Sequence, residues 1–123
     1  MRKFVERRAS PRVRFGGAVL VTAPLRSLTC AGGDLSDAGM LFYPLKGEGT
    51  ATVGETIELK FTLPRLFRWL SCEATVVRKA IVHERQAWGV AFEDLPAADR
   101  EVVRVYVAAT QQATEGAAFR ATA

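Results

Sequence analysis

Four arginines lie close together near the start of this chain and could bind an anionic ligand. The segment VERRASPRVRF (residues 5–15) holds these arginines and a single acid, Glu6. Guanidinium groups are planar, permanently charged and bidentate, so the cluster favours recognition of phosphates and base edges. Ser10 also fits an R-R-x-S kinase target, but a binding role for the arginines themselves explains more of the segment. We therefore interpret it as one half of a binding site.

The segment GGDLSDAGMLF (residues 32–42) carries the second set of polar groups. If it ends a strand, the carboxylate of Asp34 and the hydroxyl of Ser36 point to the same face. A carboxylate fits the N1 and N2 hydrogens of guanine, whose O6 and N7 accept from arginine. Gly39 suits either a positive φ or a close approach to another group. The alternative, that Asp34 and Ser36 only cap a turn, stays open on sequence alone.

The two segments together resemble the paired motifs of a known family. RASPR (residues 8–12) and DLSDAG (residues 34–39) are similar to the R-x-x-x-R and [D/N]-x-S-x-x-G motifs of PilZ domains, bacterial receptors for cyclic di-GMP. The likeness covers nearly the whole chain, because the strand WGVAFEDL and the closing segment PAADREVVRVYV also follow in the family's order. It implies a stand-alone PilZ domain.

The resemblance also implies a ligand site and a cellular role. The site residues would be Arg7, Arg8, Arg12, Asp34, Ser36 and Gly39. Arg8 and Arg12 would wrap the phosphates and guanine faces of cyclic di-GMP from a flexible arm, and the last three would hold a guanine on the barrel surface. An arginine at the position of Arg7 is associated in the family with a stacked, intercalated ligand dimer. The implied role is bacterial second-messenger signalling in motility or biofilm formation, in the cytoplasm, through an unidentified downstream protein.

The other chemistry-bearing residues form no catalytic or metal-binding pattern. His83 is the single histidine and falls in a predicted turn, where a solvated side chain is expected. Cys30 and Cys72 are far apart and in no C-x-x-C motif, which favours two buried thiols over a zinc or redox site. We predict a binding protein without catalytic residues, metal or cofactor.

The net charge of +4 is concentrated at one end of the chain. Residues 1–14 sum to +5, so the remainder is close to neutral. A local cluster favours a small anionic ligand over DNA or RNA, and no strand shows the row of aromatics that single-strand binders use. No segment approaches the roughly 20 apolar residues of a bilayer span, so no membrane insertion is expected. A monomer or weak dimer is anticipated.

Short apolar segments separated by turns predict a mainly β fold. The strict alternation in TIELKFTLP (residues 56–64) is typical of a half-buried strand, and the series of strands without intervening helices favours a small antiparallel barrel of six strands. A C-terminal helix begins near Pro96, and its predicted packing face is Val102, Tyr106, Ala109 and Ala113. We expect a flexible basic arm over residues 1–14, the barrel and helix over 15–112, and a disordered tail over 113–123.

Three functions fit these features. The first is a cyclic di-GMP receptor and adaptor in which arm closure changes a protein-docking surface. The second is a PilZ-fold interaction module of pilus or motility machinery that does not bind nucleotide, and the third is a small nucleic-acid binder. LPRLFRWLSC places Leu66, Phe67 and Trp69 among arginines, which predicts either a docking patch or side chains folded onto the core.

Overall fold

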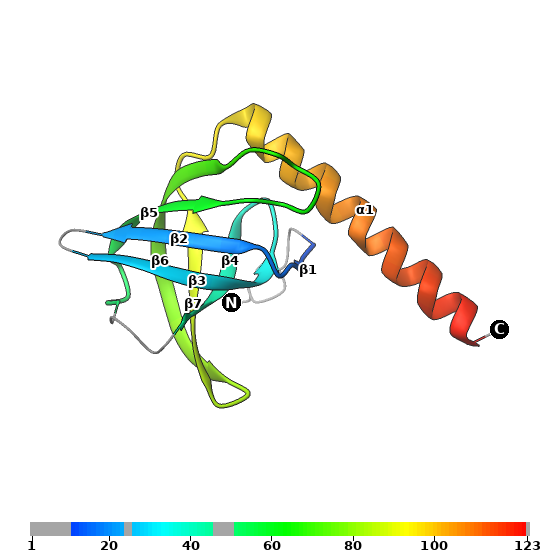
Figure 1. Ribbon diagram of the computed structural model, residues 1–123, viewed down its shortest axis with the longest axis horizontal. Helices are drawn as coiled ribbons and strands as arrows, with labels where there is room; N and C mark the ends of the chain where they lie inside the picture. Colours follow the sequence, from blue (N-terminus) through cyan, green and yellow to red (C-terminus); the bar gives the residue numbers. More distant parts are fainter. Residues whose placement is uncertain (1–10, 24–25, 46–50, 123) are drawn as a thin grey trace, which may run out of the picture.

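The structure is a computed structural model that describes residues 11–23, 26–45 and 51–122, with side chains to Ala113. It has seven strands and one helix (Figure 1): β1 (Val13–Arg14), β2 (Ala18–Ala23), β3 (Arg26–Leu35), β4 (Gly39–Pro44), β5 (Thr56–Phe61), β6 (Leu70–Val82), β7 (Arg85–Phe92) and α1 (Ala97–Thr122).

Strands β2 to β7 form a closed antiparallel barrel. The strand order is β3, β2, β5, β6, β7 and β4, and β4 pairs with β3 to close the sheet. The short strand β1 pairs with the end of β3, next to β2. Closure leaves no long unpaired edge among the six barrel strands, which protects a small sheet from edge-to-edge association. The prediction of a six-stranded barrel with a C-terminal helix is confirmed.

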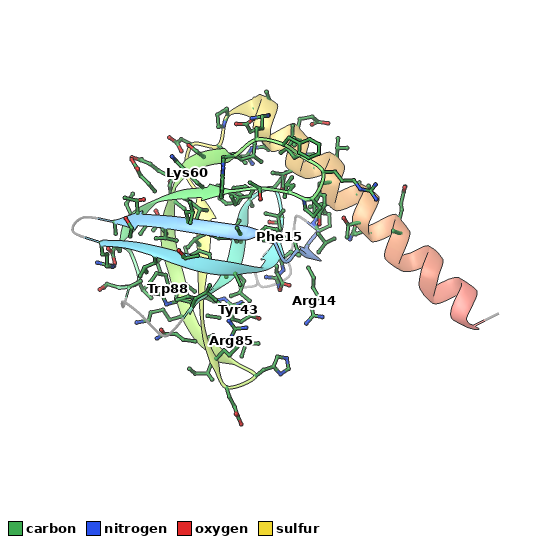
Figure 2. All side chains as sticks on the ribbon, viewed as in Figure 1. Arg14, Phe15, Tyr43, Lys60, Arg85 and Trp88 are labelled. Carbon is green, nitrogen blue, oxygen red and sulfur yellow. The ribbon has the colours of Figure 1, made fainter. Side chains whose placement is uncertain are left out.

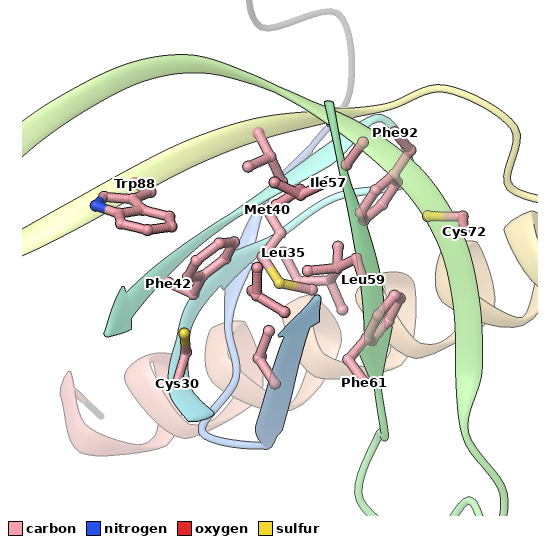
Figure 3. Packing of buried hydrophobic residues seen from close by; sticks show 14 of the residues in the cluster. Cys30, Leu35, Met40, Phe42, Ile57, Leu59, Phe61, Cys72, Trp88 and Phe92 are labelled. Carbon is pink, nitrogen blue, oxygen red and sulfur yellow. The ribbon is translucent and has the colours of Figure 1, made fainter. Parts of the chain in front are cut away.

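Aromatic rings fill the centre of the barrel (Figure 3). Alternation along β5 directs Ile57, Leu59 and Phe61 inward, and all three are buried. The ring of Phe61 stacks on Phe92 at 5.7 Å between centroids and meets the edge of Phe15 at 6.3 Å. Phe15 therefore belongs to the core, although it follows the basic segment directly. The core fixes the position at which the arm joins the barrel.

Helix α1 packs on the barrel through its first turns and then extends away from it (Figure 1). Val103 and Val107 are buried at the centre of the contact, and Val102 and Tyr106 are partly buried beside them. The predicted packing face is thus correct at Val102 and Tyr106. It is wrong at Ala109 and Ala113, which are exposed because the helix extends beyond the barrel at these positions. Helical backbone continues to Thr122 through most of segment 113–123, whose alanines favour helix.

The two cysteines are buried, as predicted. Burial raises the pKa of each thiol from 9.0 to about 12, and Asp94 and Asp99 add to the shift at Cys72. His83 is exposed at the tip of the β6–β7 hairpin, as expected for a solvated side chain. No helix in the described part of the chain is long and apolar enough to cross a membrane.

Thiol reactivity should follow from this burial. Neutral thiols are poor nucleophiles, so both Cys30 and Cys72 should resist Ellman's reagent at pH 8 in the folded protein and react fully in guanidinium chloride. Above pH 9 the thiols ionise in the unfolded chain but stay neutral in the folded chain. The free energy of unfolding should therefore fall as the pH rises from 9 towards 12. Rapid stoichiometric labelling of the native protein would contradict the account.

Truncation of the central ring should be costly. Phe61→Ala leaves a cavity between Phe15 and Phe92 and should lower the free energy of unfolding by about 3–5 kcal/mol in urea titrations. The matched control Val53→Ala, at a side chain 57% exposed, should change it by less than about 0.5 kcal/mol. Equal effects of the two variants would refute the assigned core.

Candidate ligand-binding site

The turn between β3 and β4 is built around the hydroxyl of Ser36. Its Oγ accepts hydrogen bonds from the backbone N–H groups of Ala38 at 3.1 Å and Gly39 at 3.2 Å. The Ser36 N–H in turn donates to the Gly39 carbonyl at 2.9 Å, and the serine is only 6% exposed. Ser36 therefore caps this turn, as one of the two sequence interpretations proposed.

Gly39 is required because another strand comes close. It lies opposite Ala91 in the β4–β7 pairing, and a Cβ at this position would lie 2.2 Å from the carbonyl oxygen of Val90. The φ of Gly39 is not in the left-handed region. Among the described residues, Gly54 is the glycine that has a positive φ. Of the two reasons that the sequence offered for a glycine here, the close approach is the correct one.

Asp34 lies on the outer face of β3, next to this turn. A bulge between Gly32 and Asp34 interrupts the pairing with β4, after which Asp34 lies opposite Leu41. Leu35, the next residue, is fully buried, and the side chain of Asp34 is partly exposed. A carboxylate held here can accept hydrogen bonds from a ligand on the barrel surface.

Strand β1 joins the basic segment to the strand that carries Asp34. Val13 lies opposite Leu35 and Arg14 opposite Asp34, and the Phe15 N–H donates to the Gly33 carbonyl at 2.8 Å. If the antiparallel register is continued by one residue, Arg12 comes beside the turn of Ser36. Arg12 thus directly precedes the strand that pairs with Asp34 and Leu35, next to the turn that contains Ser36 and Gly39. Arg7 and Arg8 lie outside the described residues.

A cavity of about 440 Å³ lies between these two segments and helix α1. Pro11 and Asp37, which each adjoin a motif residue, line it from the barrel side. Arg104 of α1 donates from Nε to Asp37 Oδ2 at 3.1 Å, and from Nη1 to Glu101 Oε1 at 3.0 Å. These hydrogen bonds, first that to Asp37, raise the pKa of Arg104. The helical wall of the cavity is formed by Glu101, Arg104, Val105, Val107, Ala108 and Gln111.

A basic and aromatic surface that the sequence analysis missed extends from Asp34 across the barrel. The strand pairings place Leu41 beside Asp34, Gly89 beside Leu41 and Arg78 beside Gly89. A Cβ added to Gly89 would lie 3.1 Å from Cγ and 3.2 Å from Nε of Arg78, so the arginine lies directly over the glycine.

A second arginine lies farther along the same surface. The Arg85 guanidinium lies over the ring of Tyr43, 4.6 Å from its centroid (Figure 2). Two arginines, a tyrosine and a glycine without side-chain bulk therefore share the outer face of β4, β6 and β7. The bulge in β6 between Val76 and Arg78 sets which side chains face outward, and simple alternation does not reveal it.

The close packing at Gly39 gives a direct test. Gly39→Ala should disrupt the β4–β7 pairing, because the new methyl group would overlap a backbone oxygen that cannot move alone. We expect a loss of about 2 kcal/mol or more in the free energy of unfolding. The control Gly16→Ala has no atom within 4 Å of the added Cβ and should be nearly neutral. A neutral Gly39→Ala would contradict the geometry.

Comparison with known proteins identifies this architecture. The family model described as "PilZ domain" matches residues 6–109. No curated protein matches this chain. Among solved structures, the inhibitor of motility MotI/DgrA of Bacillus subtilis has a TM-score of 0.77 at 20% identity, over 85% of this chain and 51% of that one.

Two structures of YcgR from Escherichia coli are also similar. YcgR in complex with c-di-GMP has a TM-score of 0.76 at 13% identity, over 94% of this chain and 50% of that one. The PilZ domain of YcgR with c-di-GMP has a TM-score of 0.69 at 14% identity, over 91% of this chain and 97% of that one. The chain thus spans about half the length of MotI/DgrA and of the longer YcgR chain. Family members generally bind rather than catalyse, and this chain belongs to the PilZ domain family.

Proposed function

We propose that this protein is a bacterial, cytoplasmic receptor for cyclic di-GMP that acts as an adaptor for another protein. The observation that carries the proposal is the β1–β3 register, which brings Arg12 to the strand and turn of Asp34, Ser36 and Gly39. In this proposal, Arg12 of the first motif meets the second motif at one place on the barrel. The likeness to YcgR, whose structures contain c-di-GMP, supports the same ligand class.

The ligand's chemistry matches the groups at this place. Cyclic di-GMP has two phosphates and two guanines, so its site needs positive charge for the phosphates and acceptors for the base edge. Arg8 and Arg12 supply guanidinium groups, and Asp34 supplies a carboxylate for the guanine N1 and N2 hydrogens. Arg7 would contact a second, intercalated ligand molecule. Ser36 and Gly39 act by holding the turn in shape.

The neighbouring surface offers a place for the purine rings to stack. Arg78 lies over Gly89, where the absence of a side chain leaves room for a flat ring against the sheet. Guanidinium and aromatic planes both stack on purines, and Arg85 with Tyr43 extends this surface. We propose that Arg78 contributes to binding and that Arg85 and Tyr43 form the edge of the site.

Arm closure supplies the signalling step. A ligand that binds the closed arm more tightly than the open arm shifts the population towards the closed form, and no bond is made or broken. Since Pro11, Asp37 and α1 line one cavity, a rearranged arm also changes the surroundings of the helix. The altered surface would then be recognised by a downstream protein, with the receptor a monomer or weak dimer.

The second candidate is a PilZ interaction module that binds no nucleotide. Ser36 and Gly39 have complete structural roles in the turn, so their presence does not by itself require a ligand. Asp34 and Arg12 have no such role among the described contacts of the fold, which favours the receptor. The two candidates differ in whether cyclic di-GMP binds at all.

Calorimetry with cyclic di-GMP distinguishes them. The protein should bind with a dissociation constant of about 1–10 μM, since part of the contact energy is used to order the arm. Arg12→Ala and Asp34→Ala should each weaken binding at least about tenfold while leaving the unfolding midpoint nearly unchanged. Lys60→Ala, an exposed cation on β5, should bind as the parent does. No heat with the fold intact, or equal losses in all three variants, would exclude the proposal.

A further inference from the structure

The loop between β5 and β6 exposes two aromatic side chains. Phe67 is 98% exposed and Trp69 is 46% exposed. Leu66, between them and the barrel, is partly buried and packs against the core. The sequence offered a docking patch or core packing for these three residues, and the structure divides them, with Leu66 as an anchor and the aromatics outside. We call residues 64–69 the aromatic loop.

Several contacts hold the aromatic loop in this shape. The Leu66 N–H donates to the Leu63 carbonyl at 3.0 Å, and Arg68 Nη2 donates to Asp99 Oδ1 of α1 at 2.9 Å. Arg65 has a φ of 69°, a left-handed conformation that is unfavourable for a residue with a Cβ. The exposure of Phe67 is therefore built into a loop that is anchored at both the core and the helix.

The charge of the loop is of one sign. No acid occurs from Leu63 to Cys72, and Arg65 and Arg68 flank the exposed ring. Lys60 lies opposite Ser71 on the outer face, two residues along the strand from the position of Trp69. Tryptophan and phenylalanine next to arginine is the combination that binds the headgroup region of anionic bilayers.

The size of the loop and the charges behind it favour a lipid surface over a protein. A stable protein partner covers about 800 Å² per side, far more than this short loop presents. Glu58 and Glu73 lie opposite each other farther along the same face. At the rise per residue of a β-strand, the four residues from Trp69 to Glu73 span about 13 Å. That distance exceeds the Debye length of about 8 Å, so a bilayer touched only by the loop is little affected by these two acids. Asp99 is nearer, but it is paired with Arg68, which leaves Arg65 and Lys60 as the cations that give this face its positive charge.

We propose that the aromatic loop binds anionic membrane surfaces, with Phe67 and Trp69 at the boundary of the acyl chains and Arg65 at the lipid phosphates, while Arg68 stays paired with Asp99. The contact is peripheral and needs no membrane-spanning segment. The proposal does not rest on the cyclic di-GMP site, so vesicle binding can fail or succeed whatever the outcome of the ligand titration.

Tryptophan fluorescence with vesicles tests the proposal. The chain has two tryptophans, and Trp88 is fully buried in the barrel, so a change on adding vesicles reports Trp69. With vesicles of phosphatidylglycerol and phosphatidylcholine we expect a blue shift, and with bromine-labelled acyl chains we expect quenching. Vesicles of phosphatidylcholine alone should bind at least about tenfold more weakly.

Two variants locate the contact. Phe67→Ser should weaken vesicle binding about tenfold without unfolding, because the ring contacts almost nothing in the folded protein. The matched control Ile81→Ser, 72% exposed at the opposite end of β6, should bind as the parent does.

The arginine arm could also attract vesicles, but sedimentation without quenching of Trp69 would count against the proposal. An equal loss in Ile81→Ser and Phe67→Ser would overturn it too. Absence of any binding to anionic vesicles would likewise overturn it and would assign the aromatic loop to a protein partner.

Discussion

The antiparallel pairing of β1 with the end of β3 is the constraint on which the candidate site depends. Two strand residues and the Phe15–Gly33 hydrogen bond attach the end of the basic segment to the strand that carries Asp34. Phe15 strengthens the attachment because its ring is buried against Phe61. Arg12, which directly precedes β1, is thereby held near the turn that contains Ser36 and Gly39.

The surroundings of this junction connect it to the rest of the molecule. On one side, the Asp37–Arg104 ion pair places helix α1 against the turn, and the two share a cavity with Pro11. On the other side, the small residue Gly89 lets Arg78 lie against the sheet. The ion pair is exposed on the arginine side, so it contributes modestly to stability and is suited to rearrangement. In the proposed mechanism, helix α1 and the segment that contains Pro11 would respond to a ligand, because they line the same cavity.

Much of this arrangement could be predicted from sequence. The alternation in β5 identified the strand and its buried face. The two motif segments identified Ser36 and Gly39, and the turn cap and the close approach that the structure shows were among the roles that the sequence offered for them. The helix face was predicted only in part, because periodicity does not show where the barrel ends and so included Ala109 and Ala113. Arg78 was missed because a bulge shifts the alternation of β6, and bulges arise from pairing between strands rather than from local sequence alone.

The central claim, that the arm and the β3–β4 turn form one site, is tested most directly by nuclear magnetic resonance. Backbone amide shifts would be followed while cyclic di-GMP is added to the labelled protein. The account predicts that the largest changes occur together at residues 12–15 and 34–39, with further changes at Arg78 and Gly89. Changes confined to one of the first two segments, or none at saturating ligand, would contradict it.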